Sequence, residues 1–263
     1  MSITISVHSD TCIRCGRCAV VCPANILQQK EKKGDITVVG PRTCIRCGHC
    51  LDVCPTGSIE HSALEPSKFH VLDYTKLPTA EQLMELFHAR RSNRSMQADR
   101  PIPAEAIAQI EEAARYAPTA ANNLKVHTHY IDDRARLDRI IDFVIDTLTV
   151  AGEKMSVMAQ FEFRHLRQVR QAGGDPIMRN GSGLLLFTSD TAWGEPDCNL
   201  AYQNASLMAE VLGISQVWMG YMYTAIHNAD AEVVADLFET KEKICACMSL
   251  GIPAFRYPRY MER

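Results

Sequence analysis

The stretch Thr11-Cys12-Ile13-Arg14-Cys15-Gly16-Arg17-Cys18, followed by Cys22-Pro23, recurs as Thr43-Cys44-Ile45-Arg46-Cys47-Gly48-His49-Cys50, followed by Cys54-Pro55. The two copies are offset by 32 residues, from Cys12 to Cys44, and each has the spacing C-x2-C-x2-C-x3-C-P. Eight of the eleven cysteines fall into this internal duplication. The repeat predicts two copies of one cysteine-rich unit in a small N-terminal module.

This spacing is typical of bacterial-type ferredoxin modules with two [4Fe–4S] clusters, in which the fourth cysteine of each run ligates the other cluster. Two residues between cysteines let three thiolates of one loop reach three irons of one cubane. Structural zinc sites favour paired C-x2-C knuckles, and disulfides need an oxidising compartment, for which the sequence carries no signal. We therefore expect two ligand sets: Cys12, Cys15, Cys18 and Cys54, and Cys44, Cys47, Cys50 and Cys22.

Composition and charge bear on the partners and the location of the protein. The 263 residues are 46% hydrophobic and 22% charged, with a formal net charge of −3. These values are ordinary for a globular protein and give no reason to expect a nucleic-acid partner. No apolar run approaches the roughly eighteen residues of a transmembrane helix, and the N-terminus lacks a secretory-signal pattern. We expect a cytoplasmic protein without a membrane span.

A change in pattern separates the cysteine module from the rest of the chain. Residues 63–78 contain two prolines and no sustained helical or strand periodicity. We therefore predict a ferredoxin domain over residues 1–62, a linker over residues 63–78 and a second domain over residues 79–263.

Hydrophobic periodicity predicts a mixed second domain. Thr79 and Gln82 fit a capping box, and Leu83, Leu86 and Phe87 form the apolar face of the helix that follows. The later helices and strands show no regular βαβ alternation and no G-x-G-x-x-G, which favours an α+β fold over a Rossmann domain. The further elements we expect are a helix after Pro103, strands over 126–131, 183–188, 215–219 and 244–250, and helices over 134–171 with a break at Gly152, 197–213 and 230–238.

A cationic segment, Arg90-Arg91-Ser92-Asn93-Arg94, follows the first of these helices. Arginine binds phosphate with bidentate geometry, and serine adds a further donor. Basic residues at the C-terminal end of a helix also complement its dipole. Taken alone, the segment is therefore either an anion site or a solvated helix end.

Together with its neighbours, this segment resembles the nitroreductase family. Arg90-Arg-Ser-Asn-Arg and Ala113-Ala-Arg-Tyr-Ala-Pro-Thr-Ala-Ala-Asn-Asn are similar to that family's R-R-S-x-R and A-P-S-x-x-N signatures. Leu212-Gly-Ile-Ser-Gln-Val-Trp-Met-Gly and Leu250-Gly-Ile-Pro resemble two later motifs. The resemblance covers the chain from about Glu81 to its end, and the whole chain resembles the ferredoxin–nitroreductase fusion proteins of anaerobic bacteria and archaea.

The resemblance implies FMN bound at a homodimer interface. It assigns the FMN phosphate to Arg90 and Ser92, with Arg91 beside them, and places Arg94 near flavin N1 and O2. The remaining contacts that it implies are Pro118, Thr119, Ala120 and Asn122 from the partner subunit, Gly220 and Tyr221 near the flavin ring, and Arg259 and Arg263 toward the phosphate. Solvent, Tyr221, Tyr223 and Cys198 remain open as proton donors, and no catalytic residue is identified.

Three cysteines lie outside the duplication. Cys245 and Cys247 alternate in a predicted strand, and we expect both to be buried on one face of it. Cys198 is expected in the first turn of a helix, where the dipole can lower a thiol pKa, although simple packing is the favoured interpretation.

The two halves together predict an FMN-dependent oxidoreductase, because a cluster exchanges one electron at a time and FMN collects two. An external donor, which is a ferredoxin, a flavodoxin or NAD(P)H, would supply electrons. The acceptor would be a small organic molecule such as a nitro compound, a quinone or an activated alkene. The alternatives are a non-enzymatic electron carrier or flavin relay in a larger redox complex, and a flavin-transforming role. The sequence identifies neither the acceptor, the donor nor the direction of electron flow.

Overall fold

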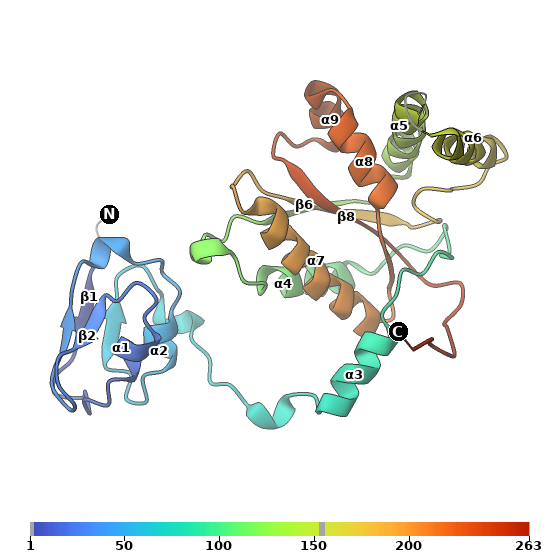
Figure 1. Ribbon diagram of the computed structural model, residues 1–263. Helices are drawn as coiled ribbons and strands as arrows, with labels where there is room; N and C mark the ends of the chain where they lie inside the picture. The colour runs from blue at the N-terminus through green and yellow to red at the C-terminus, as the bar shows by residue number, and fades with distance from the viewer. Residues whose placement is uncertain (1–2, 153–155, 263) are drawn as a thin grey trace. The chain divides into compact units, whose positions relative to one another are not determined.

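The computed structural model describes residues 3–152 and 156–262 and divides into two compact units (Figure 1). Unit 1 comprises Met1–Leu77 and Ala121–Asn123, and unit 2 comprises Pro78–Ala120 and Leu124–Arg263. The division after Leu77 falls at the end of the expected linker. The narrower boundaries at residues 62 and 78 stay a prediction.

Unit 1 is built from short elements around the cysteine loops. Strand β1 (Ile5–Val7) pairs with β4 (Ile59–His61), and β2 (Leu27–Gln29) pairs with β3 (Ile36–Val38), both antiparallel. The duplication is visible in the fold, because α1 (Arg17–Val21) and α2 (His49–Asp52) begin at equivalent positions of the two repeats. Leu27 and Ile59 are also equivalent, and both are buried in the small core. The unit also contains the 3-10 turns η1 (Pro41–Thr43), η2 (Pro66–Lys68) and η3 (Tyr74–Lys76).

Unit 2 is centred on an antiparallel sheet with the order β5-β6-β8-β7. The inner strands β6 (Gly183–Thr188) and β8 (Ile244–Gly251) are buried along their whole length, because helices cover both faces (Figure 1). Their sequences therefore read as continuous apolar runs rather than as alternating patterns. The outer strands are β5 (His127–Ile131) and β7 (Ser215–Trp218).

The helices of unit 2 form two layers. On one face of the sheet lie α4 (Ala104–Arg115) and α7 (Gly194–Val211), which pack on each other, while α3 (Ala80–Ala89) contacts α7 (Figure 1). The other face carries four helices: α5 (Arg134–Gly152), α6 (Val157–Gln171), α8 (Gly220–Asn228) and α9 (Ala231–Phe238). Among the helices of the described ranges, none has the length and apolar character needed to cross a bilayer.

Several expectations of local structure are confirmed. The α+β class holds, Thr79 and Gln82 form the capping box of α3, and α5 ends at Gly152. The apolar face of α4 is buried through Ile107, Ile110 and Ala114. Helix α8 was not expected, because its nine residues include Gly220, two tyrosines and a threonine, which have modest helix propensity.

One expectation about β8 is wrong. Cys245 and Cys247 are both buried, but they do not share a face: Cys245 packs in the core on the α4 and α7 side, and Cys247 packs in the core on the α5 side. The reason is an irregularity in the ladder, since Phe187 pairs with Ala246 whereas Thr188 pairs with Ile244. A bulge of this kind inserts one residue and interrupts the alternation of side chains.

Candidate cofactor sites

Two hollows in unit 1 are each lined by four cysteines. Cys12, Cys15, Cys18 and Cys54 line the first hollow. Cys22, Cys44, Cys47 and Cys50 line the second. Each hollow thus collects three cysteines of one repeat and the fourth cysteine of the other, which is the exchange expected for a two-cluster module. Four thiols around each hollow fit a [4Fe–4S] cluster, and the ligand assignment stays a prediction that this arrangement supports.

Backbone N–H groups point at the fourth cysteine of both runs. Ile26 N donates to Cys22 Sγ over 3.3 Å, and Ser58 N donates to Cys54 Sγ over 3.3 Å. The two donors are equivalent positions of the repeat. Gly16 and Gly48 adopt φ of 76° and 80°, and a Cβ at Gly16 would collide with the Gln29 side chain. Glycine is therefore favoured at both turns by the positive φ.

His61 is a residue of the second hollow that the sequence analysis missed. Its Nδ1 accepts a hydrogen bond from Ala63 N over 3.0 Å, so the ring proton lies on Nε2, which is 3.3 Å from Cys44 Sγ. Burial lowers the pKa of His61, and the nearby charge of Arg46 acts in the same direction. The ring is thus a neutral donor to a cysteine sulfur. The signal in the sequence is the position of His61 in the duplication, where it is equivalent to Gln29 of the first repeat.

In unit 2, the cationic segment after α3 is attached to strand β7. Ser92 forms a bridge with Gln216, and Asn93 N donates to Gln216 O over 3.2 Å. The buried Asn93 side chain donates to Ser215 Oγ over 2.8 Å and to Phe255 O over 3.1 Å. Asn93 therefore fixes the backbone within the cationic segment, a structural role that the motif alone does not indicate.

The charges of three arginines act on a half-buried carboxylate of α7. Burial raises the pKa of Glu210, and the charges of Arg256, Arg90 and Arg91 oppose that shift. Arg91 also lies over the Tyr257 ring, 4.3 Å from its centroid. Three cations around one carboxylate leave an excess of positive charge that suits a phosphate group.

The C-terminal segment contains a further arginine close enough to act on the same carboxylate. Arg256, which the sequence analysis did not single out, acts on the same carboxylate as Arg90 and Arg91. Arg259 is exposed, and its proposed contact with a phosphate stays a prediction. Arg263 lies outside the described residues.

Tyr221 lies at the start of α8, next to Gly220, and is linked to α6. Its hydroxyl donates a hydrogen bond to Glu162. Burial raises the pKa of Tyr221 to about 12 and Glu162 adds to that shift, whereas the charges of Arg179 and Arg94 oppose it. The exposed Arg94 and the half-buried Tyr221, both expected at the flavin ring, thus act on each other electrostatically.

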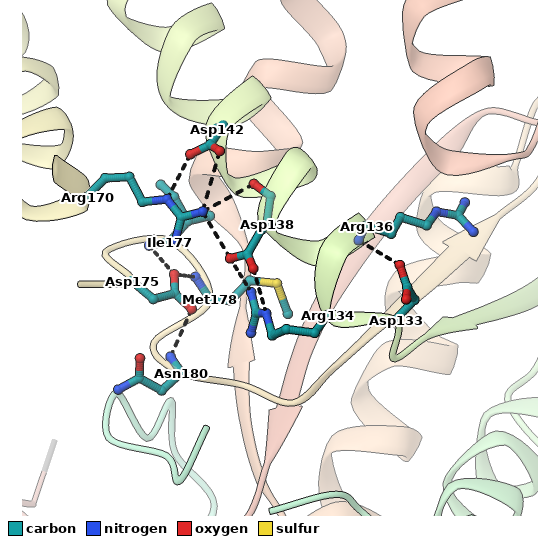
Figure 2. A network of polar contacts seen from close by, with 10 residues as sticks. All are labelled: Asp133, Arg134, Arg136, Asp138, Asp142, Arg170, Asp175, Ile177, Met178 and Asn180. Atoms are coloured by element: carbon teal, nitrogen blue, oxygen red, sulfur yellow. Dashed lines mark hydrogen bonds and ion pairs between the residues drawn. The ribbon is translucent and has the colours of Figure 1, made fainter. Parts of the chain in front are cut away.

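The loop that carries Arg179 is held by one carboxylate, as Figure 2 shows. Asp175 accepts hydrogen bonds from the backbone N–H groups of Ile177, Met178 and Asn180, over 3.1, 2.8 and 3.0 Å. Arg179 O in turn accepts from Met96 N, which follows the cationic segment. On the neighbouring helices, Arg170 of α6 binds Asp138 and Asp142 of α5 (Figure 2).

The loop over residues 118–122 makes its hydrogen bonds with α7 and with unit 1. Ala120 N donates to Asp197 at the start of α7, and Leu124 N donates to Thr119 Oγ1. Pro118 is exposed, and Asn122 belongs to unit 1, where its side chain donates to Ile45 O and Arg46 O. The turn η4 (Ala120–Asn122) includes two residues with positive φ, Ala121 and Asn122. The resemblance assigned this loop to the partner subunit, and that assignment stays a prediction.

The expectation that Cys198 lies in a first helical turn is wrong. Helix α7 begins at Gly194, so Cys198 lies in the second turn, and its side chain is fully buried. The pKa of Cys198 is raised and not lowered. The larger cause is a hydrogen bond with Cys245, and the second is burial. Its thiol is therefore a packing group and not an activated nucleophile.

Comparison with solved structures places unit 2 in a known fold. A nitroreductase with bound FMN from Bacteroides fragilis is 23% identical, with a TM-score of 0.55 over 69% of this chain and 95% of that chain. Another, from Desulfitobacterium hafniense, is 18% identical, with a TM-score of 0.56 over 68% and 93% of the two chains. At these identities the likeness concerns the fold.

Comparison of sequences agrees with the structural likeness. A protein of Archaeoglobus fulgidus, named as a putative NADH dehydrogenase/NAD(P)H nitroreductase, is 27% identical over 147 residues, which are 53% of this chain and 68% of that protein. Residues 11–58 match the family profile of the 4Fe-4S dicluster domain. Residues 87–252, more than half of the chain, match the family profile of the nitroreductases. This protein is therefore a member of the nitroreductase family that carries a 4Fe–4S dicluster domain at its N-terminal end.

Proposed function

We propose that the protein is an FMN-dependent oxidoreductase that passes electrons through two [4Fe–4S] clusters to FMN and reduces a small organic acceptor. A nitro compound, a quinone or an activated alkene would serve as the acceptor. The observation that carries the proposal is the presence, in one chain, of two four-cysteine hollows and a nitroreductase domain in which three arginines act on one carboxylate. FMN, when bound, supplies the conversion between one-electron and two-electron chemistry.

The residues of unit 2 fit FMN at both ends of the cationic segment. Arg90, Arg91 and Arg256 would hold the phosphate, with Ser92 as a further donor. Arg94 would stabilise negative charge on the reduced flavin, because a nearby cation favours the charged form of an acid. Gly220 and Tyr221 would lie beside the ring.

The chain's own groups would also control protons near the acceptor. Tyr221, with a pKa of about 12, keeps its proton at neutral pH, and its hydrogen bond to Glu162 fixes the direction of the hydroxyl. Glu162 would hold Tyr221 as a positioning residue, and Tyr221 would donate a proton to the reduced acceptor. Tyr223 makes the same kind of contact, because its hydroxyl donates to Glu195 over 2.7 Å, and we favour Tyr221 because the charge of Arg94 acts on it.

A second copy of the chain would complete the flavin site. The apolar residues Leu83, Met84 and Phe87 of α3 are 39%, 52% and 45% exposed, and α3 has no buried residue. This face supports a homodimer, in which the loop over residues 118–122 would reach the flavin of the partner subunit. The electron donor in this scheme is a ferredoxin, a flavodoxin or NAD(P)H.

The test is anaerobic purification followed by quantification of iron, acid-labile sulfide and flavin per chain. We expect about eight irons and about one FMN. A screen of nitro compounds, quinones and activated alkenes should then give catalytic turnover that Tyr221→Phe reduces. Eight irons without flavin would refute the coupled enzyme, and full cofactors without turnover would leave the flavin relay as the function.

A further inference from the structure

We propose that the surface of unit 1 around Cys15 docks an acidic, low-potential one-electron carrier protein, which delivers electrons to the cluster of the first hollow. This inference rests on the function proposed above and specifies its donor. The docking surface consists of Ile13, Arg14, Arg17, Val20, Lys30, Lys32 and Lys33.

The two hollows differ in the solvent exposure of their cysteines. Cys15 is exposed, whereas the other seven cysteines of the duplication are half-buried or buried. Its counterpart in the second repeat, Cys47, is half-buried. Because electron transfer between proteins requires a short path between cofactors, an exposed ligand marks the edge at which a partner can approach most closely.

Exposed apolar side chains flank Cys15. Ile13 is 61% exposed and Val20 is 86% exposed. The second repeat is different at both equivalent positions, since Ile45 is half-buried and Asp52 replaces Val20. Apolar groups at the centre of a surface with charges around them are typical of protein interfaces.

The segments next to these apolar residues carry five positive charges. Arg14 and Arg17 lie in the first cysteine loop, and Lys30, Lys32 and Lys33 lie in the turn between β2 and β3. The turn is attached to the loop, because Gln29 Nε2 donates to Arg14 O over 3.1 Å and to Gly34 O over 2.8 Å. The carboxylates in these segments are Glu31 and Asp35, and Asp35 pairs with Arg14 at 2.6 Å.

The balance of charge is reversed in the second repeat. Residues 10–35 carry five cations against Asp10, Glu31 and Asp35, whereas the equivalent residues 42–67 carry two cations, Arg42 and Arg46, against three carboxylates, Asp52, Glu60 and Glu65. The excess of five cations over three carboxylates in the first repeat therefore favours an acidic partner there. Electron-transfer complexes typically have small interfaces. One electron leaves the carrier and enters the first cluster, and no bond or proton is exchanged.

The test uses the anaerobic full-length holoprotein and an acidic flavodoxin as the probe. Calorimetry would give the Kd at about 25 mM and about 200 mM salt, and stopped-flow mixing with reduced flavodoxin would give the rate of cluster bleaching. The patch variant is Lys30→Glu/Lys32→Glu. The matched control is Arg42→Glu/Lys68→Glu, which makes the same charge change on exposed residues of unit 1 outside the patch. Val20→Asp tests the apolar centre, and it introduces the residue type that the fold already accepts at the equivalent position, Asp52.

We expect Lys30→Glu/Lys32→Glu to raise the Kd about tenfold or more, Val20→Asp to raise it severalfold, and the control to change it less than about twofold. Higher salt should weaken wild-type binding. Equal losses in both double variants, or binding that does not depend on salt, would overturn the proposal, as would binding of nucleic acid or anionic vesicles in place of flavodoxin.

Dithionite separates this proposal from the function on which it rests. If dithionite reduces the clusters and the flavin but flavodoxin neither binds nor reduces them, the docking surface is refuted and the coupled enzyme stands. If flavodoxin binds at the patch and reduces the clusters while the flavin stays oxidised, the coupled enzyme is refuted and the docking surface stands.

Discussion

At the scale of single residues, His61 distinguishes the two cysteine-lined hollows. It offers a neutral N–H to Cys44, whereas Gln29 at the equivalent position binds the backbone oxygens of Arg14 and Gly34. Hydrogen bonds to sulfur stabilise the more negative, reduced form of a cluster and so raise its potential. The second cluster is therefore expected to gain a contribution from His61 that Gln29 does not give to the first.

The substitution His61→Phe should lower the potential of one cluster and not of the other. A hydrogen bond of about 1 kcal/mol corresponds to a decrease of roughly 40 mV for a one-electron couple. Potentiometric titration followed by EPR spectroscopy measures both clusters. Gln29→Leu is the matched control and should leave the potential of the second cluster unchanged. An equal decrease at both clusters after His61→Phe would indicate a general loss of structure instead.

Arg256 and Arg259 give a second comparison at this scale. Arg256 acts on Glu210 together with Arg90 and Arg91, whereas Arg259 is exposed. We expect Arg256→Ala to raise the Kd for FMN about tenfold, because a charge-assisted hydrogen bond to phosphate contributes roughly 1.5–3 kcal/mol. Arg259→Ala should change it less than about twofold. Fluorescence titration of apoprotein with FMN measures both values, and the opposite order would assign the phosphate to Arg259.

At the scale of secondary-structure elements, α3 is a well-formed helix whose apolar face is only partly covered within the described part of the chain. Its capping box is complete, yet Leu83 and Phe87 remain partly exposed. Helices of this kind gain most of their stability from packing of the apolar face, which favours an intermolecular contact.

The double substitution Leu83→Glu/Phe87→Glu should therefore convert a dimer to a monomer in light scattering after size-exclusion chromatography. Buried glutamates without partners would oppose association. Glu81→Gln/Glu85→Gln, on exposed positions of the same helix, is the control and should leave the mass unchanged. A wild-type protein that is monomeric at micromolar concentration would contradict the expected homodimer.

The sequence predicts these elements well where one residue pattern dominates. The cysteine spacing, the capping box at Thr79 and the buried stripe of α4 depend on local rules, and the structure agrees with them. The sequence does not predict the helical turn of Cys198, because α7 begins three residues earlier than the pattern indicates. It does not predict the face of Cys245 either, because the bulge in β8 depends on tertiary packing. Arg256 and His61 were missed because their partners are distant in the chain, at Glu210 and Cys44.

At the scale of the whole molecule, the proposed function depends on two units that share one chain. A covalent connection makes the encounter between electron donor and acceptor intramolecular, so its rate does not depend on protein concentration. The proposed order of transfer, from clusters to flavin, therefore makes a kinetic prediction that a mixture of separate proteins would not satisfy.

After a pulse that delivers less than one electron per chain to the clusters, flavin reduction should follow with a first-order rate constant. That constant should stay the same over about a tenfold range of protein concentration. Cys47→Ser, which removes a proposed ligand of the second cluster, should slow this phase, whereas Cys198→Ala, outside both hollows, should not. A rate that rises in proportion to protein concentration would mean that electrons pass between separate molecules. An unchanged rate in Cys47→Ser would mean that the flavin is reduced without the second cluster. The second cluster would then not lie on the path of electrons to the flavin.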